Sequence, residues 1–139
     1  MFNFSVNLFS VFVSGIAAMF VGGLWYSPMV FGTYWMNKSG VTMPDKQAAK
    51  KEGLVHLYAG QFVLSCIGAY VLAHFVGSLG VISFGSAFQL AFWLWIGVQF
   101  PLIASSALWE KKPWGLVCIN AGGNLLSMVV MTTILAYWR

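Results

Sequence analysis

The sequence predicts an all-α polytopic membrane protein, in which residues 1–139 form a single domain with a bundle of four transmembrane helices. Hydrophobic residues make up 60% of the chain and charged residues only 7%, and the mean hydropathy is +0.81. A soluble domain of this length needs far more charge to cover its surface. The 15 glycines and seven tryptophans are also typical of membrane helices and their interfacial aromatic belts.

Four apolar segments are each long enough to cross a bilayer, since a helical span needs about 20 residues. We expect the spans at about residues 5–27, 54–76, 84–108 and 114–138, none of which contains Asp, Glu, Lys or Arg. The first is expected to stay in the mature protein, because no basic residue precedes Lys38 and a signal peptide begins with a basic region.

The connection between the first two spans is predicted to form an interfacial or cytoplasmic helical segment. Pro28 should end the first helix, and the aromatic stretch 29–35 should lie in the headgroup layer. Thr42 and Asp45 have the spacing of a helix start that runs toward the second span. The other two connections are short, so the helices that they join should pack antiparallel.

Proline affects the third span. Pro101 cannot donate a hydrogen bond to the carbonyl of Gly97, so we expect the helix to be kinked there.

Lysines indicate the orientation of the bundle. In a four-span arrangement, the first and third connections lie on one side of the membrane, and they contain Lys38, Lys46, Lys50, Lys51, Lys111 and Lys112. The positive-inside rule places this side in the cytoplasm and both termini outside. The basic residues are too few to suggest nucleic acid as a partner, and beside apolar segments they suit membrane lipids.

Four side-chain amides form a candidate polar cavity. Gln61, Gln99, Asn120 and Asn124 should lie within about 10 Å of the membrane midplane in its cytoplasmic half. They could form hydrogen bonds between helices that fix the helix register. They could instead line a binding cavity or path for an ion or a small molecule.

No pattern predicts catalytic residues, a cofactor or a metal. The spans contain no carboxylate, which counts against proton-coupled exporters and most cation-coupled carriers. Hydrolase, zinc-protease, nucleotide-binding and CxxC motifs are missing. His56 and His74 lie about 27 Å apart along one helix and cannot share a metal in one chain.

Small residues recur at every fourth position of the first span, at Ser14, Ala18 and Gly22. Such faces allow helices to approach closely. We expect them to serve packing within the chain or between copies, and we expect a homo-oligomer because closed symmetric assembly is common.

Two stretches of the chain resemble a known family. They comprise Gly23-Leu24-Trp25-Tyr26-Ser27-Pro28 with Phe31-Gly32 and Trp35, and Trp95-Ile96-Gly97 with Pro101, Trp109-Glu110, Pro113-Trp114 and Ile119-Asn120-Ala121-Gly122. The pattern resembles small bacterial membrane proteins catalogued as domain of unknown function 1761. The resemblance covers nearly the whole chain and implies four helices in the bacterial cytoplasmic (inner) membrane, but no activity.

The first of these stretches forms a candidate interfacial motif of Trp25, Tyr26, Ser27, Pro28 and Trp35. Its aromatic residues suit the headgroup layer, and its proline suits a helix end, so we expect an anchor. The alternative is that Tyr26, Ser27 and Trp35 line the cytoplasmic mouth of a site near the amides.

The sequence therefore favours a homo-oligomeric, non-enzymatic bundle with a path or binding cavity for a small molecule or ion. One alternative is a membrane enzyme or lipid-handling protein. Another is an accessory subunit of a larger membrane complex whose partner supplies the activity.

Overall fold

The computed structural model describes residues 6–25 and 54–138. Its helices are α1 (Leu8–Trp25), α4 (Leu54–Ser78), a third span composed of α5 (Phe84–Leu94), η1 (Trp95–Gln99) and α6 (Phe100–Trp109), and α7 (Trp114–Tyr137). Each of the four spans is long and apolar enough to cross a membrane, which confirms the predicted all-α, multi-pass architecture. The segment predicted between the first two spans, with Tyr26, Ser27, Pro28 and Trp35, lies outside the described residues.

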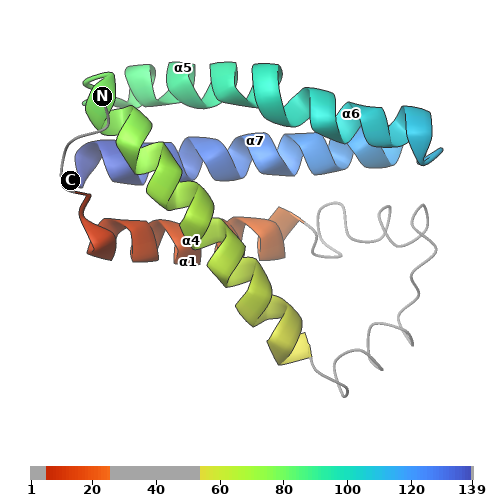
Figure 1. Ribbon diagram of the computed structural model, residues 1–139, viewed down its shortest axis with the longest axis horizontal. Coiled ribbons are helices and arrows are strands. Elements are labelled where there is room, and N and C mark those ends of the chain that lie inside the picture. Colours follow the sequence, from red (N-terminus) through yellow and green to blue (C-terminus); the bar gives the residue numbers. More distant parts are fainter. Residues whose placement is uncertain (1–5, 26–53, 139) are drawn as a thin grey trace.

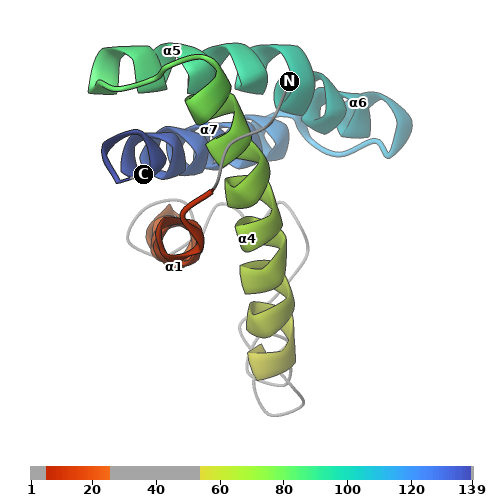
Figure 2. The ribbon, with the colours of Figure 1, turned by 60° about the vertical axis from the view of Figure 1, so that its left-hand side comes forward.

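Helix α7 is the central element of the bundle. It lies between α1 on one side and the third span on the other, and it also contacts α4 (Figures 1 and 2). Ten residues of α7 are buried, more than in any other described helix. The bundle is therefore organised around the last helix of the chain.

Helix α4 crosses the other helices obliquely, and its N-terminal end stands away from them (Figures 1 and 2). It packs on α1 and α7, whereas α5 packs on α7. The expectation that the short connection would make α4 and α5 an antiparallel pair is therefore wrong. The connection turns sharply at Gly80, whose φ is +65°, and Val81 is buried behind it, so α5 is directed over α7 instead.

The start of α5 is held by polar contacts at the same end of the bundle. Ser83 caps α5, and its side chain accepts a hydrogen bond from the backbone N–H of Ser86. The backbone N–H of Phe84 donates to the hydroxyl of Tyr137 at 3.0 Å, which joins the first turn of α5 to the last turn of α7.

Close helix contacts rely on small residues. Ala69, Ala87 and Ala91 have no exposed surface, and a Cβ added to Gly15 of α1 would lie 2.6 Å from the Sγ of Cys66 on α4. Because lipid tails are as apolar as the core, membrane helices gain stability from such tight packing rather than from the hydrophobic effect. The α1–α4 crossing at Gly15 and Cys66 therefore fixes where α4 meets the bundle.

The third span is interrupted where the sequence predicted a kink. Residues Trp95–Gln99 form a π-helical turn, and Pro101 lies in the first turn of α6 immediately after it. In a regular α-helix the proline ring would clash with the carbonyl of Gly97, and the wider π turn gives the chain room at this point.

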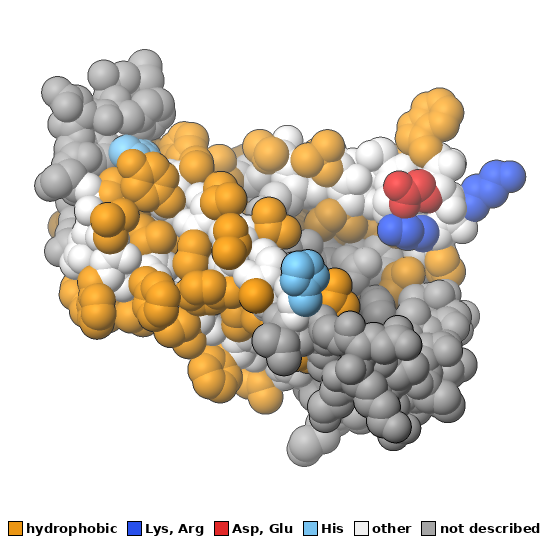
Figure 3. Space-filling view, turned by 60° about the horizontal axis from the view of Figure 1, so that its bottom comes forward, with side chains coloured by type: hydrophobic (Ala, Val, Ile, Leu, Met, Phe, Trp, Pro, Cys, Tyr) orange, Lys and Arg blue, Asp and Glu red, His pale blue; other side chains and the backbone are white. Residues whose placement is uncertain are grey.

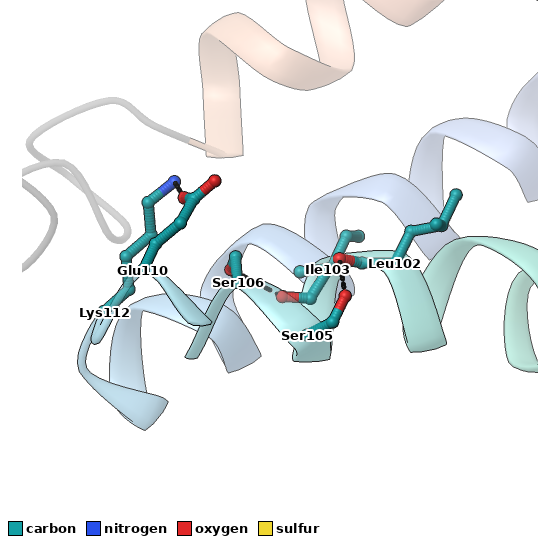
Figure 4. Close-up of polar contacts among 6 residues, drawn as sticks. All are labelled: Leu102, Ile103, Ser105, Ser106, Glu110 and Lys112. Atoms are coloured by element: carbon teal, nitrogen blue, oxygen red, sulfur yellow. Dashed lines mark hydrogen bonds and ion pairs between the residues drawn. The ribbon is translucent and has the colours of Figure 1, made fainter. Parts of the chain in front are cut away.

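Charged side chains among the described residues gather at one end of the molecule, while its sides are largely apolar (Figure 3). They belong to the connection between α6 and α7, where Lys112 pairs with Glu110 at 3.1 Å. The nearby hydroxyls of Ser105 and Ser106 donate to carbonyls one turn back in α6 (Figure 4). These serines are satisfied within their own helix.

We predict that Gly15→Ala lowers the free energy of unfolding by about 1–3 kcal/mol, because its new methyl group would overlap the sulfur of Cys66. Equilibrium unfolding in mixed micelles measures this. The matched control is Gly68→Ala on α4, where an added Cβ meets nothing within 4 Å. The double variant Gly15→Ala/Cys66→Ala should recover part of the loss. Equal stability of the two single alanine variants would contradict the close crossing.

Candidate functional site

The oblique path of α4 opens a cleft between α4 and the rest of the bundle. Its volume is about 690 Å³, which lies within the usual range of about 300–1,000 Å³ for small-molecule sites. The lining comes from α1, α4, η1 and α7 and comprises Ala18, Met19, Gly22, Gly23, Tyr58, Gln61, Leu64, Ser65, Gly68, Gln99, Gly123, Asn124, Ser127, Met128 and Met131.

Three of the four amides in the predicted polar cavity line this cleft. Gln61 comes from α4, Gln99 from η1 and Asn124 from α7. Asn120 is half-buried and is not among the residues that line the cleft. Its backbone carbonyl instead accepts a hydrogen bond from the side chain of Asn124.

The side-chain hydrogen bonds of Gln61 and Asn124 stay within single helices. Asn124 Nδ2 donates to the carbonyl of Asn120 at 3.0 Å, and Gln61 Nε2 donates to Ser65 Oγ at 3.5 Å. The Oε1 of Gln99 is buried and accepts no hydrogen bond from the residues that the structure describes. In residues 6–25 and 54–138, therefore, Gln61, Gln99 and Asn124 do not link one helix to another.

Apolar and very small residues complete the cleft. Methionines from α1 and α7 supply flexible, polarisable surface, at Met19, Met128 and Met131. An added Cβ at Gly22 or Gly68 would meet nothing within 4 Å, so these glycines leave space beside the helix backbones. The sequence did not predict that these methionines and glycines line a cleft, because single methionines and glycines in apolar helices usually serve packing.

The described part of the lining carries no charged side chain. Among the lining residues that the structure describes, none is Asp, Glu, Lys, Arg, His or Cys. In the described part of the chain, no three His, Cys, Asp or Glu side chains come together as a metal site. The arrangement can offer hydrogen bonds and apolar contact to a molecule that carries no net charge.

Two tryptophans hold α7 beside the cleft. The indole Nε1 of Trp25 donates to the carbonyl of Ile119, and that of Trp95 donates to the carbonyl of Ala121, each at 2.8 Å. The Trp25 ring lies against Gly122 and Gly123, where an added Cβ would come within 2.9 Å of it.

Gly122 and Gly123 allow the Trp25 ring to lie close to α7, because they have no side chains. In an α-helix, the side chain four residues on shields a carbonyl, so Gly123 leaves the carbonyl of Ile119 open to a second donor. The interfacial motif was expected to act as an anchor in the headgroup layer. The described part of that motif, Trp25, packs against α7, and the expectation of an anchor in the headgroup layer stays a prediction. Sequence reasoning missed the hydrogen bond of Trp95 to Ala121, and the Gly122–Gly123 pair was a signal only that a large ring, here Trp25, could lie against α7.

The chain matches the family model described as "Protein of unknown function (DUF1761)" over residues 9–136. No curated protein matches the chain, and no solved structure does.

We predict that Trp25→Phe lowers the free energy of unfolding by about 0.5–1.5 kcal/mol, because phenylalanine fills much of the same space but cannot donate to Ile119. The control is Trp93→Phe in α5, since Trp93 is 68% exposed. Thermal unfolding in detergent compares the two variants. If both behave like the original protein, the indole hydrogen bond does not stabilise the bundle.

Proposed function

The chain belongs to the DUF1761 family, and on the geometry of its own cleft we propose that it binds a small uncharged molecule between α1, α4 and α7. The observation that carries this proposal is the convergence of Gln61, Gln99 and Asn124 from three different helices on one cleft. Each of them keeps hydrogen-bonding capacity that no other described helix uses.

The membrane environment supports this proposal. Inside a bilayer, a polar group without a hydrogen-bond partner costs several kcal/mol. Amides that serve only to hold helices together would be expected to bond across the interface. A bound molecule in a cleft of this size could supply hydrogen-bond partners to Gln61 and Asn124, which are exposed and line the cleft.

An uncharged ligand fits better than an ion. A permeating or bound ion must be compensated by charged side chains or by a ring of carbonyl oxygens, and the lining residues of 6–25 and 54–138 include no charged side chain. A membrane enzyme gains no support from the described lining either, because those residues include no Asp, Glu, Lys, Arg, His or Cys.

The proposed orientation is based on the lysines. With Lys111 and Lys112 in the cytoplasm and both termini outside, the cleft lies near mid-depth of α7 and between the cytoplasmic halves of α1 and α4. Helix α4 diverges from the bundle on this side (Figure 2).

We also propose a homo-oligomer. Large apolar side chains of α4, among them Leu57, Val63 and Ile67, are more than half exposed. They offer a face for a second copy as well as for lipid. Lipid handling is the second candidate function, since the lining combines amides with methionines and could take both the polar and the apolar part of a lipid.

We predict that the protein released gently from its own membranes carries a stoichiometric small-molecule adduct, which native mass spectrometry detects and weighs. Asn124→Leu should reduce the adduct at least tenfold, because leucine fills the space and offers no hydrogen bond. The assembly state should be unchanged, since Asn124 bonds only within α7.

The matched control is Gln89→Leu, which removes an exposed amide of α5 that does not line the cleft. This variant should retain the adduct. Loss of folding or assembly in Asn124→Leu alone would show that the amide acts as a link between helices. Equal loss of the adduct in both variants would remove the cleft as the binding site.

A further inference from the structure

We infer that the ligand of the cleft is an uncharged amphiphile, with a hydroxyl or amide head that donates a hydrogen bond to Asn124 Oδ1 and an apolar tail that lies along the methionines of α7. This inference rests on the proposed function and specifies the chemistry of the molecule. It is carried by the orientation of one amide and by the order of side chains along the cleft.

The orientation of the Asn124 amide is determined by its partner. Its side chain lies 3.0 Å from the backbone carbonyl of Asn120. A carbonyl oxygen can only accept, so the amide atom that faces it must be Nδ2. Oδ1 is consequently turned away from that carbonyl, and no hydrogen bond to it is formed by the described residues. Asn124 is exposed and lines the cleft, so it presents an acceptor to whatever occupies the space.

The other two amides are less available as acceptors. Gln99 Oε1 is enclosed by protein, so a molecule in the cleft does not reach it without moving the side chain. Gln61 faces Ser65, whose hydroxyl can donate as well as accept. Asn124 is therefore the acceptor whose orientation is fixed and whose surface is open.

Polarity decreases along the cleft. From Asn124 the lining residues of α7 continue with Ser127, Met128 and Met131, a distance of about 10 Å along the helix axis. Helix α1 runs in the opposite direction alongside, and its lining residues change from glycine at Gly22 to Met19 and Ala18. One end of the cleft thus suits a polar head, and the other suits a hydrocarbon tail about 10 Å long.

A charged head is disfavoured at this position. Neither a carboxylate nor a phosphate would find a counter-charge among the lining residues that the structure describes, and burying an uncompensated charge is far more costly than burying a hydroxyl. An ether or an ester without O–H or N–H could fill the cleft, but it would leave Asn124 Oδ1 without a donor.

The test uses three photoreactive probes that share one diazirine-bearing alkyl chain and differ only at the head, as a primary alcohol, its methyl ether and the corresponding carboxylate. The full-length protein in lipid nanodiscs is irradiated with each, and mass spectrometry maps the labelled residues. We expect the alcohol to label the α7 methionines Met128 and Met131 about threefold to tenfold more than the ether does, as one hydrogen bond would give. The carboxylate should label them least.

Two variants test whether the preference for the alcohol over the ether depends on the Asn124 amide. Asn124→Leu should abolish the difference between alcohol and ether, whereas Gln89→Leu should preserve it. The comparison of alcohol with ether in the original protein needs no variant, so it decides the inference even if Asn124→Leu does not fold.

The outcomes separate the two proposals. Equal labelling of the methionines by alcohol and ether, above the labelling of the lipid-exposed Phe12 and Phe20 of α1, would overturn the amphiphile inference and leave the binding cleft in place. Labelling of the methionines no stronger than that of Phe12 and Phe20, with every probe, would overturn the proposed binding function itself.

Discussion

Two indole N–H groups that bond to neighbouring carbonyls of α7 are the interaction on which the bundle depends. Trp25 reaches α7 from α1 and Trp95 reaches it from η1, and their acceptors, Ile119 and Ala121, lie two residues apart. In lipid, the hydrophobic effect contributes little to the association of helices. Hydrogen bonds and close packing must therefore hold them together. Here the glycine pair of α7 provides both, because it admits an aromatic ring and exposes a carbonyl.

The cleft results from this arrangement together with the position of α4. The tryptophans hold α1, η1 and α7 together, whereas α4 meets α1 most closely at the crossing of Gly15 and Cys66. Because the helix crosses obliquely, its N-terminal half separates from the bundle (Figure 1). The space that opens is bounded by amides, glycines and methionines. A helix that packed antiparallel along its whole length would have closed it.

The π turn is the other structural element that shapes the cleft. Gln99 is its last residue and takes part in the lining, and the regular helix α6 with Pro101 begins directly after it. One additional residue in a helical turn rotates the rest of the helix relative to a regular one, and such turns are frequent at functional sites. The third span thus uses one local irregularity both to accommodate proline and to place an amide.

The sequence by itself determined the four spans and their lack of charged residues, because length, hydropathy and composition are local properties. It also indicated the interruption at Pro101 and the amides Gln61, Gln99 and Asn124 as a group, since periodicity and depth can be calculated from helical rise. Only the tertiary structure decided that Asn120 does not line the cleft, that Trp25 docks on Gly122 and Gly123, and that α4 crosses obliquely. These features depend on how closely α4 approaches Gly15 and on how the Trp25 ring lies against Gly123, and such contacts are made between segments far apart in the chain.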